Sequence, residues 1–462
     1  MLAQPQNKKR VYIETYGCQM NVSDSEVVSS LLANEGYEFT DDIESADVIL
    51  VNTCSVRENA ETRIYGRLGE FKRMKANRPE VVVGVLGCMA ERLRSKLSSE
   101  KAKGVGQAID LVVGPDEYRK VPELIYNAWH GEKGIAVQLS RVETYDDIIP
   151  LRTNGISAWL TVMRGCDKFC TFCVVPFTRG RERSRTLASI VKEVEQLSAK
   201  GFKEVTLLGQ NVNSYLDGNH DFADLMKAVA MVDPSIRVRF TTSHPQDMSD
   251  KLINAIAENE NISKFIHLPV QSGSERILEL MNRTYTRAHY MRLVEKIKNL
   301  MPEATWSTDI IAGFPTETDE DHRQTIDLMK EVGYDGAFMF KYSPRENTPA
   351  FKMADDIDEA TKTARIDEIV RLQTDISLKK NQADIGKTFE ILVEGESKKS
   401  NEEWMGRTDG SKTVIFPRGE FKVGDYISVK VNRANSATLF GTVESVSGAK
   451  TRKELDGVSA VA

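Results

Sequence analysis

Short apolar runs alternate with helical stretches along most of this chain, and this alternation limits the possible folds more than any other feature. Between Val11 and about Trp129, the runs VYIETYGC, ADVILVNTC and VVVGVLGC are separated by helical stretches. Strands separated by helices are joined by crossover connections and form a parallel sheet. We therefore predict an open parallel α/β sheet over residues 11–141, preceded by a loose tail at residues 1–10.

A second alternation begins at Ala158, after a polar stretch at 142–155 that we interpret as a linker. Its strand-like runs are AWLTVMRG, EVTLLGQ, RVRFTTS, KFIHLPV, TWSTDIIAGF and DGAFMFKYS. The helical stretches between them are Leu187–Lys200, Phe222–Met231, Asp250–Glu258, Arg287–Leu300 and Asp319–Glu331. A closed barrel of this kind needs about eight repeats, so these runs predict a partial (β/α)6 barrel over residues 156–383.

The last part of the chain has a different pattern. A long amphipathic helix is expected over Ile357–Asp384, with the apolar series Ile366, Ile369, Val370, Leu372, Ile376 and Leu378. After it, FEILVEG, KTVIFP, YISVKVNRA and TLFGTVESV are short strand-like runs without helical stretches between them. They predict a small all-β barrel over residues 384–446. Residues 447–462 are polar and are expected to be disordered.

Composition excludes several classes of protein. The chain has 462 residues with 62 basic and 68 acidic side chains, a net charge of -6. This charge excludes a protein that is held on nucleic acid by bulk charge, but it leaves room for a local basic groove. No apolar run approaches the roughly 18 residues of a membrane span, and the N-terminus does not resemble a secretory signal. We therefore expect a cytoplasmic protein without a membrane partner.

Cys166, Cys170 and Cys173 form a C-x3-C-x2-C motif directly after the first strand of the second alternation. Four-iron clusters are normally held by four thiolates. Three thiolates from one loop can bind three irons and leave the fourth open to a substrate or cofactor. Zinc is the main alternative metal, but its sites usually combine two cysteine pairs or include histidine. Three unrelated core cysteines are the structural alternative.

Cys18, Cys54 and Cys88 each end a strand-like run, in ETYGC, LVNTC and VLGC. The carboxyl ends of parallel strands converge on one crevice of an open sheet. These three thiols are therefore predicted to form a second metal site. A disulfide pair with one free cysteine is the alternative, and it fits poorly with a chain that lacks an export signal.

The cysteine motif, with Phe172 before its last cysteine and six βα repeats behind it, resembles the radical S-adenosylmethionine (SAM) superfamily. Three further cysteines in an N-terminal α/β domain, and a C-terminal barrel similar to a TRAM domain, narrow the resemblance to the methylthiotransferases. Several motifs over about residues 11–446 resemble the branch that modifies dimethylallyladenosine in tRNA: NTCSVRENAE, CTFCVVPFTRGRERSR, TSHP, HLPVQSGS, MNRTYTR, DIIAGFPTET and YSPRENTPA.

Two positions depart from the pattern of that family. Thr316 stands where the family motif GFPGET has glycine, and Glu346-Asn347 stands where glycine is more common. If the turn at 316 needs a positive φ, threonine cannot replace glycine freely. We therefore expect the local backbone to relax there.

The resemblance implies methylthiolation at C2 of N6-dimethylallyladenosine 37 in tRNA. One SAM, bound to a [4Fe–4S] cluster on Cys166, Cys170 and Cys173, would give a 5′-deoxyadenosyl radical after one-electron reduction. A second [4Fe–4S] cluster on Cys18, Cys54 and Cys88 would carry the sulfur, and a second SAM would donate the methyl group. The implied partners are the tRNA anticodon loop and an electron donor such as flavodoxin or ferredoxin. The chain is expected to act as a monomer.

Two other functions stay open on the sequence. One is a sister methylthiotransferase that acts on a ribosomal-protein aspartate or on threonylcarbamoyladenosine in tRNA. The other is a non-catalytic iron–sulfur protein that binds RNA. No catalytic acid or base is expected for radical chemistry, and His244 and His267 are interpreted as structural.

Candidate contacts to SAM and RNA follow from position and residue type. The SAM candidates, each of which could instead be an ordinary polar or packing residue of the barrel mouth, are Phe172, Gln210, Asn211, Ser243, Gln271, Arg283 and Asp309. Arginine makes bidentate phosphate contacts, which makes candidates of Arg179, Arg181, Arg183 and Arg185. Their alternative is a solvated helix start. The candidate RNA face of the C-terminal barrel contains Lys398, Lys399, Trp404, Arg407 and Lys412.

Overall fold

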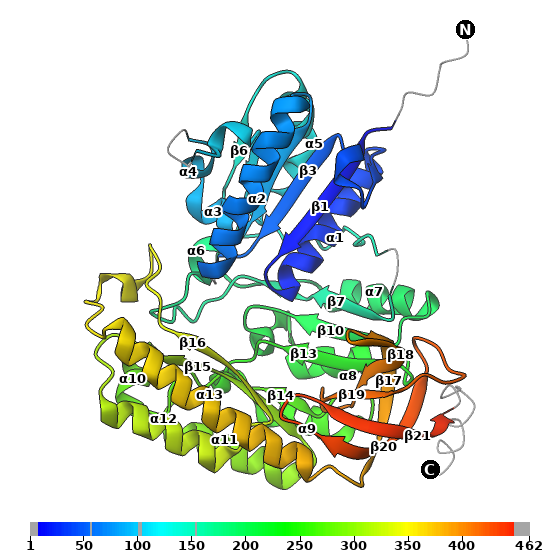
Figure 1. Cartoon of the computed structure of the whole chain (residues 1–462), viewed down its shortest axis with the longest axis vertical. Helices are drawn as coiled ribbons and strands as arrows, with labels where there is room; N and C mark the ends of the chain where they lie inside the picture. The colour runs from blue at the N-terminus through cyan, green and yellow to red at the C-terminus, as the bar shows by residue number, and fades with distance from the viewer. Residues whose placement is uncertain (1–7, 56–57, 100–103, 153–154, 448–462) are drawn as a thin grey trace.

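The computed structural model describes residues 8–55, 58–99, 104–152 and 155–447, which form three units (Figure 1). Most of the two predicted tails, and residues 56–57 of the NTCSVRENAE motif, lie outside the described residues. Among the helices in the described ranges, none is long and apolar enough to cross a membrane.

The N-terminal unit is a parallel sheet with the strand order β2-β1-β3-β4-β5-β6. Its strands are β1 (Arg10–Tyr16), β2 (Glu38–Phe39), β3 (Val48–Thr53), β4 (Val82–Gly87), β5 (Leu111–Val113) and β6 (Gly134–Ala136). Its helices are α1 (Gln19–Asn34), α2 (Glu58–Asn77), α3 (Cys88–Leu93), α4 (Ser95–Ser98) and α5 (Val121–Trp129), with short 3-10 turns at Ile43–Ser45, Gly106–Ala108 and Tyr118–Lys120.

Both faces of this sheet are covered, which explains why its central strands are continuously apolar. Successive side chains of a strand point to opposite faces. Val48 and Leu50 of β3 accordingly belong to one buried cluster, with Val28 of α1. Ile49 and Val51 belong to the cluster on the other face. The predicted open parallel sheet is confirmed.

The central unit contains all six predicted strands, in two parallel sheets ordered β13-β10-β7 and β14-β15-β16. A parallel bridge between Val238 and Ile262 joins the two halves. The strands are β7 (Ser157–Thr161), β10 (Glu204–Leu208), β13 (Arg237–Thr241), β14 (Phe265–His267), β15 (Thr305–Ala312) and β16 (Gly336–Lys341). This arrangement is the predicted partial barrel.

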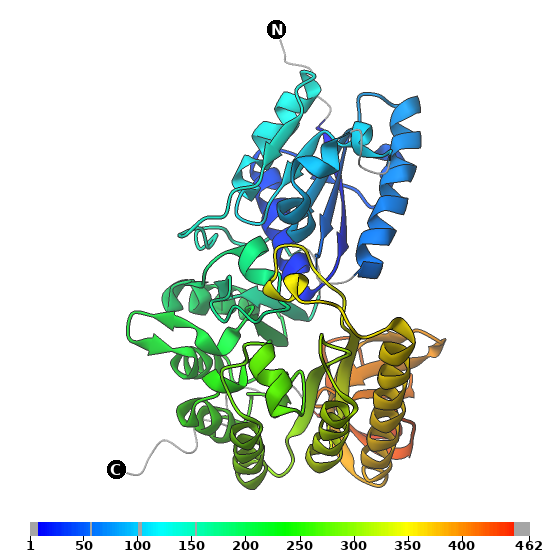
Figure 2. The same cartoon turned by 90° about the vertical axis from the view of Figure 1, so that its left-hand side faces the viewer.

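Helices cover the outside of the partial barrel (Figures 1 and 2). They are α7 (Leu187–Ala199), α8 (Phe222–Val232), α9 (Asp250–Glu258), α10 (Glu275–Leu280), α11 (Arg287–Leu300), α12 (Asp319–Val332) and α13 (Glu359–Gln382), while α6 (Val175–Arg179) follows the cysteine motif. Short strands β8 (Met163–Arg164), β9 (Arg183–Ser184), β11 (Leu216–Asp217) and β12 (His220–Asp221) form two hairpin-like pairs, and 3-10 turns lie at Val212–Ser214, Pro245–Asp247 and Pro349–Lys352.

The buried stripe of α13 differs from the predicted apolar series. Only Ile369 of that series is fully buried, and Val370 is 40% exposed. The other buried positions are polar, namely Lys362, Arg365, Gln373, Ser377 and Asn381. They bind backbone and carboxylate groups of neighbouring segments, as Gln373 does with the Tyr334 carbonyl at 2.9 Å. Ile366, Ile369 and Leu372 pack on the core of the central unit, and polar side chains add hydrogen bonds that apolar periodicity does not reveal.

The C-terminal unit is a closed barrel ordered β17-β18-β19-β21-β20. Its strands are β17 (Thr388–Ser397), β18 (Ser400–Arg407), β19 (Thr413–Pro417), β20 (Tyr426–Ala434) and β21 (Leu439–Ser447). The barrel confirms the predicted fold and adds β18, which the sequence did not indicate. It packs against the amino ends of the central strands, where Arg239 donates to the carbonyl of Thr408 at 2.9 Å.

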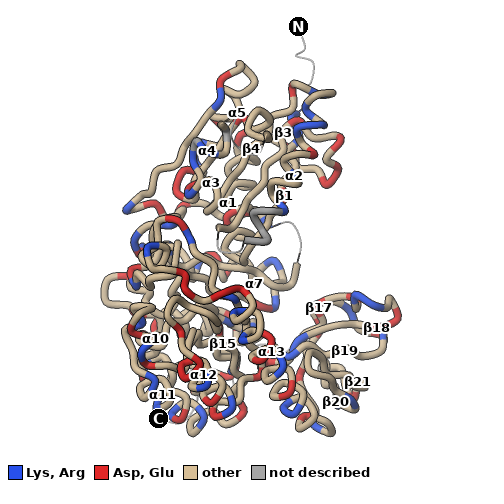
Figure 3. The backbone as a smooth tube through the Cα atoms, turned by 60° about the vertical axis from the view of Figure 1, so that its left-hand side comes forward, with Lys and Arg blue, Asp and Glu red and all other residues tan. Residues whose placement is uncertain are grey.

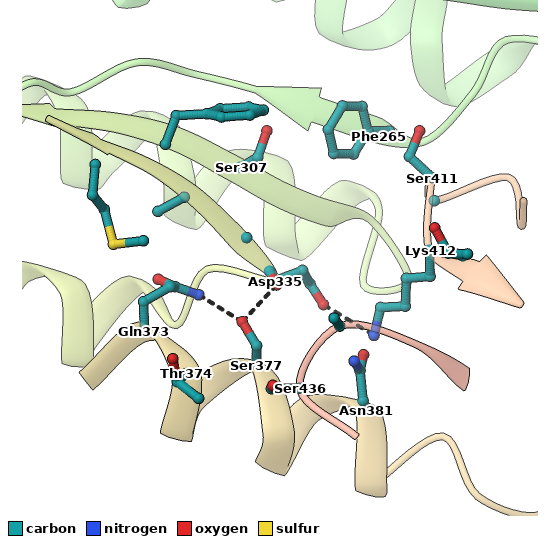
Figure 4. Close-up of a pocket in the computed structure, with 17 residues that line it drawn as sticks. Phe265, Ser307, Asp335, Gln373, Thr374, Ser377, Asn381, Ser411, Lys412 and Ser436 are labelled. Atoms are coloured by element: carbon teal, nitrogen blue, oxygen red, sulfur yellow. Dashed lines mark hydrogen bonds and ion pairs between the residues drawn. The ribbon is translucent and has the colours of Figure 1, made fainter. Parts of the chain in front are cut away.

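A cavity of about 420 Å³ lies at this contact (Figure 4). It is lined by the start of β14, the loop before β16, the second half of α13 and turns of the C-terminal barrel. Lys412 spans one end of it, with ion pairs to Asp335 at 3.1 Å and Asp384 at 2.7 Å. The cavity is at the opposite end of the strands from all six cysteines.

The N-terminal unit contacts the carboxyl-end side of the central unit (Figure 1). Ser23 of α1 hydrogen-bonds Thr161 of β7 at 2.9 Å. The predicted linker packs against the N-terminal unit, because Tyr145 is 2% exposed and donates to the Pro115 carbonyl at 2.9 Å. The segment after β16 also reaches the N-terminal unit (Figure 2), and Glu346 pairs there with Lys96 at 3.1 Å.

Candidate functional site

Cys18, Cys54 and Cys88 are brought together by the register of three neighbouring strands. Tyr16 of β1 pairs with Thr53 of β3, and Thr53 pairs with Gly87 of β4. Each cysteine follows its strand within two residues, so all three stand at one edge of the sheet. The structure thus confirms the predicted convergence, and none of the six cysteines forms a disulfide.

Glycine allows this close approach at two of the three positions. Gly17 has φ +137°, and a Cβ there would lie 2.5 Å from the Cβ of Cys54. Gly87 has φ +90°, and a Cβ there would lie 2.4 Å from Oδ1 of Asn52. Both positions require glycine because the backbone is left-handed and the neighbouring atoms leave no space.

The thiols of this set interact electrostatically. A hydrogen bond with Cys54 lowers the pKa of Cys18 to about 6, and the charge of Arg179 acts in the same direction. Cys18 Sγ also contacts Oδ1 of Asn21 at 3.3 Å. Burial raises the pKa of Cys88, while Arg179 opposes that shift.

The second set, Cys166, Cys170 and Cys173, occupies a tight loop after β8. Gly165 has φ +78°, and a Cβ there would lie 2.0 Å from the carbonyl oxygen of Arg181. The N–H of Cys166 donates to the Gly180 carbonyl at 3.2 Å, which fixes the start of the loop. Burial raises the pKa of both Cys166 and Cys173 to about 12. Cys170 Sγ accepts a hydrogen bond from Nη1 of Arg283 at 3.3 Å.

Arg179 joins the two cysteine sets across the boundary between the units. It ends α6, which begins two residues after Cys173, and its Nε lies 3.2 Å from Sγ of Cys88. Its Nη2 lies 2.7 Å from the carboxylate of Asp24 in α1. The two candidate sites therefore lie near one another at the boundary between the N-terminal and central units, where Arg179 is one of several contacts.

Within the described residues, no three His, Cys, Asp or Glu side chains surround a point suited to one metal ion. This is compatible with iron–sulfur clusters. Their thiolates bind different iron atoms, so they stand farther apart than the ligands of a single ion.

Several predicted SAM contacts carry buried polar atoms without a hydrogen-bond partner in the described part of the chain. These atoms are Nε2 and Oε1 of Gln210, Oδ1 of Asn211 and Oγ of Ser243. The residues follow the paired strands β10 and β13, whose last residues, Leu208 and Thr241, are in register. An unsatisfied buried polar group costs about 1–3 kcal/mol. A polar ligand at this edge would supply the missing partners, so these residues fit SAM.

The other SAM candidates are placed as follows. The backbone of Gln271 bridges β15, since its N–H donates to the Asp309 carbonyl at 2.9 Å. The Asp309 side chain lies 3.7 Å from Nε2 of His267. Phe172 packs against the apolar cluster that includes Phe314. Arg283 is engaged with Cys170 and with the Pro269 carbonyl at 2.9 Å.

His244 belongs to the same edge, although its predicted role is structural. Its Nε2 is buried and has no partner in the described part of the chain, and it follows Ser243 directly. Burial, with the charges of Arg283 and Lys168, lowers its pKa to about 2, so the ring is neutral at pH 7. The sequence signal for this placement is its position directly after Ser243, a predicted SAM contact, in the TSHP motif.

The predicted RNA role of three arginines is corrected by the structure. Arg179, Arg183 and Arg185 are all at most 6% exposed. Their guanidinium groups pair with Asp24 at 2.7 Å, Asp116 at 2.5 Å and Glu193 at 2.7 Å respectively. A buried, paired guanidinium cannot bind phosphate on the surface. Only Arg181 of this run is exposed, and it pairs with Asp167 at 2.6 Å.

The predicted RNA face of the C-terminal barrel also loses two of its residues. Trp404 is 8% exposed within the barrel core, and Lys412 is 12% exposed at the cavity described above. Neither can form part of an open RNA surface. Lys398 and Lys399 are exposed, and Arg407 pairs with Glu394 at 3.1 Å. Basic and acidic residues are interspersed over all three units, with basic residues at the turn between β17 and β18 (Figure 3).

Asp24, the carboxylate that receives Arg179, was not among the predicted site residues. Asp24 is fully buried and binds both Arg164 and Arg179 at 2.7 Å. The hydroxyl of Tyr118 also donates to it at 3.2 Å. No spacing rule connects residues more than 100 positions apart in sequence, so only the structure reveals this cluster.

Comparison with known proteins adds family relationships. The model of the uncharacterized protein family UPF0004 matches residues 10–114, that of the radical SAM superfamily residues 160–329, and that of the TRAM domain residues 382–443. A relative from Chloroherpeton thalassium is 53% identical over 94% of this chain and 96% of its own. One from Parabacteroides distasonis is 52% identical, covering 94% and 95%. Both are named tRNA-2-methylthio-N(6)-dimethylallyladenosine synthase.

The chain belongs to this synthase family. It is a radical SAM enzyme, and a [4Fe–4S] cluster and SAM are cofactors of the family. The fold agrees with that of the radical SAM methyltransferase TsrM from Kitasatospora setae, with a TM-score of 0.55 and 16% identity over 74% of this chain and 77% of that one. The sister activities on a ribosomal protein or on threonylcarbamoyladenosine are not favoured by these relatives.

Proposed function

We propose that this chain replaces the C2 hydrogen of N6-dimethylallyladenosine 37 in tRNA by a methylthio group. The observation that carries the proposal is the contact of Arg179 with Cys88, since Arg179 ends the short helix that begins two residues after Cys173 and thus links that segment to the N-terminal cysteine set. A substrate base between them would reach both sites from one position.

The chemistry divides between the two sites. With cofactors bound, Cys166, Cys170 and Cys173 hold the cluster and SAM that supply the 5′-deoxyadenosyl radical, while Cys18, Cys54 and Cys88 hold the cluster that supplies the sulfur. The role of the chain's own side chains is to bind SAM and to orient it. Gln210, Asn211 and Ser243 offer the unsatisfied polar atoms that would hold SAM at the ends of β10 and β13.

The chain's packing also shields part of the site. Cys54, Cys88, Cys166 and Cys170 are each at most 9% exposed, whereas Cys173 is partly exposed and Cys18 is exposed. The backbone of Ala350, in the segment after β16, donates to the Thr171 carbonyl within the cysteine loop at 2.8 Å. Exclusion of water protects a reactive intermediate from side reactions.

We further propose that the protein works as a monomer in the cytoplasm, where tRNA is found. A one-electron donor such as flavodoxin or ferredoxin would reduce the cluster on the Cys166 loop.

Two triple variants test the division of labour. Replacing Cys166, Cys170 and Cys173 with Ala should leave about half of the iron, because four of eight irons are lost if each set holds one four-iron cluster. It should also abolish release of 5′-deoxyadenosine from SAM. Replacing Cys18, Cys54 and Cys88 with Ala should leave that release intact and stop methylthiolation. Iron analysis, chromatography of released 5′-deoxyadenosine and mass spectrometry of tRNA nucleosides measure these three outcomes. Methylthiolated product from the second variant would contradict the proposal.

A further inference from the structure

Two buried arginines pair with Asp24, and only one of them also contacts a cysteine. Arg164 and Arg179 are 2% and 3% exposed, and each places a guanidinium nitrogen 2.7 Å from the Asp24 carboxylate. Both come from the central unit, while Asp24 lies on α1 of the N-terminal unit. Only Arg179 extends further, to Sγ of Cys88 at 3.2 Å.

A purely structural ion pair does not account for this second contact. Arg164 already pairs with Asp24, and its guanidinium stacks on the ring of Tyr145 at 4.6 Å. Both guanidinium groups keep buried nitrogens with no partner in the described part of the chain, Nε and Nη1 of Arg164 and Nη1 of Arg179. Of the two, only the guanidinium of Arg179 also reaches a thiol. Buried N–H groups in proteins normally have an acceptor. A cluster bound to the Cys88 thiolate would provide one for the Nη1 of Arg179.

We propose that Arg179 is a positioning residue for the cluster held by Cys18, Cys54 and Cys88, donating a charged hydrogen bond to the Cys88 thiolate. The inference rests on the proposed function, because it takes these cysteines as the cluster ligands. Arg179 belongs to the unit that carries the radical-generating loop. One side chain therefore sets the position of the sulfur-carrying cluster relative to that loop.

The proposal has an electronic consequence. Hydrogen bonds to the sulfurs of an iron–sulfur cluster are among the factors that set its reduction potential. A positive donor at Cys88 stabilises the reduced cluster, which carries one more electron. Loss of the donor should therefore lower the midpoint potential of this cluster.

The experiment uses the full-length chain with Cys166, Cys170 and Cys173 replaced by Ala, so that a single cluster remains. Into this parent we would introduce Arg179→Gln or, as the matched control, Arg164→Gln. Both substitutions remove a buried guanidinium from Asp24, but only the first removes the donor to Cys88. After anaerobic loading with iron and sulfide, an EPR-monitored titration gives the midpoint potential of each protein.

We expect a lower midpoint potential for Arg179→Gln and an unchanged one for Arg164→Gln. Equal shifts in both variants, or no shift in either, would overturn the role of Arg179. If Arg179→Gln does not fold, Arg179→Lys decides in its place. Arg179 reaches Asp24 and Cys88 through two separate nitrogens. Lysine has a single nitrogen, which the Asp24 carboxylate would hold, so the potential should still fall. A parent that binds no iron would instead overturn the cluster assignment within the proposed function.

Discussion

Thr316 and Asn347 show how single residues can depart from a family pattern without changing the backbone. Their φ angles are +68° and +74°. The relaxation expected at Thr316 is therefore wrong, and the left-handed turn is retained. Its N–H donates to Asp356 at 2.7 Å and its hydroxyl accepts from Arg276 at 3.1 Å. Asparagine tolerates this region, whereas a β-branched residue is a genuine outlier.

Thr316→Gly should therefore stabilise the protein. The left-handed conformation costs a non-glycine residue about 1–2 kcal/mol, and the entropy of glycine in the unfolded chain returns about 0.5–1 kcal/mol of that. We expect a net gain of about 1 kcal/mol in the free energy of unfolding, measured with urea, by difference of these values. Asn347→Gly is the control and should change stability little. Destabilisation by Thr316→Gly would show that the hydroxyl contact outweighs the strain.

The arginines after the cysteine motif show which property of a residue the sequence does not predict, namely whether its side chain is exposed or buried. TRGRERSR predicts positive charge beside the motif, and the charge is there. Whether a guanidinium faces solvent or a buried carboxylate depends on partners such as Asp24 and Asp116, which are distant in sequence. Cys18, Cys54 and Cys88, in contrast, lie at one edge of the sheet as expected, because each follows a strand whose carboxyl end is readable from the pattern.

Secondary-structure elements were predictable where periodicity and caps agree. The expected helix at Asp319–Glu331 is observed as α12 (Asp319–Val332), with Thr318 and Asp321 forming a capping box. β18 was missed because its sequence, SNEEWMGR, begins with four polar residues. The polar stripe of α13 was missed because its attachments are hydrogen bonds to the barrel, which leave no apolar period.

Asp321→Ala tests how α12 is held. The Asp321 carboxylate accepts from the Thr318 N–H at 2.8 Å, from Ser274 Oγ at 2.5 Å and from Arg276. Loss of a charged hydrogen-bond acceptor costs about 1.5–3 kcal/mol, and we expect a loss of that size in urea unfolding at pH 7. Glu320→Ala, on the same turn but exposed, is the control and should cost less.

Asp321→Ala should also reveal how the stability supplied by Asp321 depends on pH. The hydrogen bonds from Arg276, Ser274 and Thr318 lower the pKa of Asp321 below its usual 3.8. A lowered folded-state pKa gives stability that is present above pH 3.8 and is lost as the pH falls toward the folded value. The stability difference between wild type and Asp321→Ala should therefore shrink below about pH 4. A difference that stays constant from pH 7 to pH 3 would contradict this.

At the scale of the whole molecule, we expect the exposed basic residues to determine how tRNA is held. With Arg179, Arg183 and Arg185 buried, the accessible candidates are Arg181, Lys398 and Lys399. Replacing Lys398 and Lys399 with Ala should weaken tRNA binding and flatten its salt dependence, by about 0.7 in slope per lost contact to single-stranded phosphate. Filter binding at several salt concentrations measures this, with Lys330→Ala on the outer helix α12 as the control. An unchanged slope would remove the β17–β18 turn from the RNA interface.

Arg181→Gln tests the remaining accessible candidate for an RNA contact. The side chain lies beside the cysteine motif, above the ring of Phe169 at 5.5 Å. Its loss should lower tRNA affinity and leave SAM cleavage without RNA unchanged, because the guanidinium pairs with Asp167 rather than with a cysteine. Lost cleavage with normal tRNA affinity would assign Arg181 to the cofactor.

The buried Asp24 also affects how the protein is made. Asp24 leaves the ribosome early, but its partners Arg164 and Arg179 follow 140 and 155 residues later. At about 5–20 residues per second, that separation corresponds to roughly 7–30 s of synthesis. During this interval the carboxylate has neither arginine, so the face of α1 that carries it stays hydrated. The N-terminal unit can therefore complete its packing at this face only after the cysteine motif and α6 have been translated.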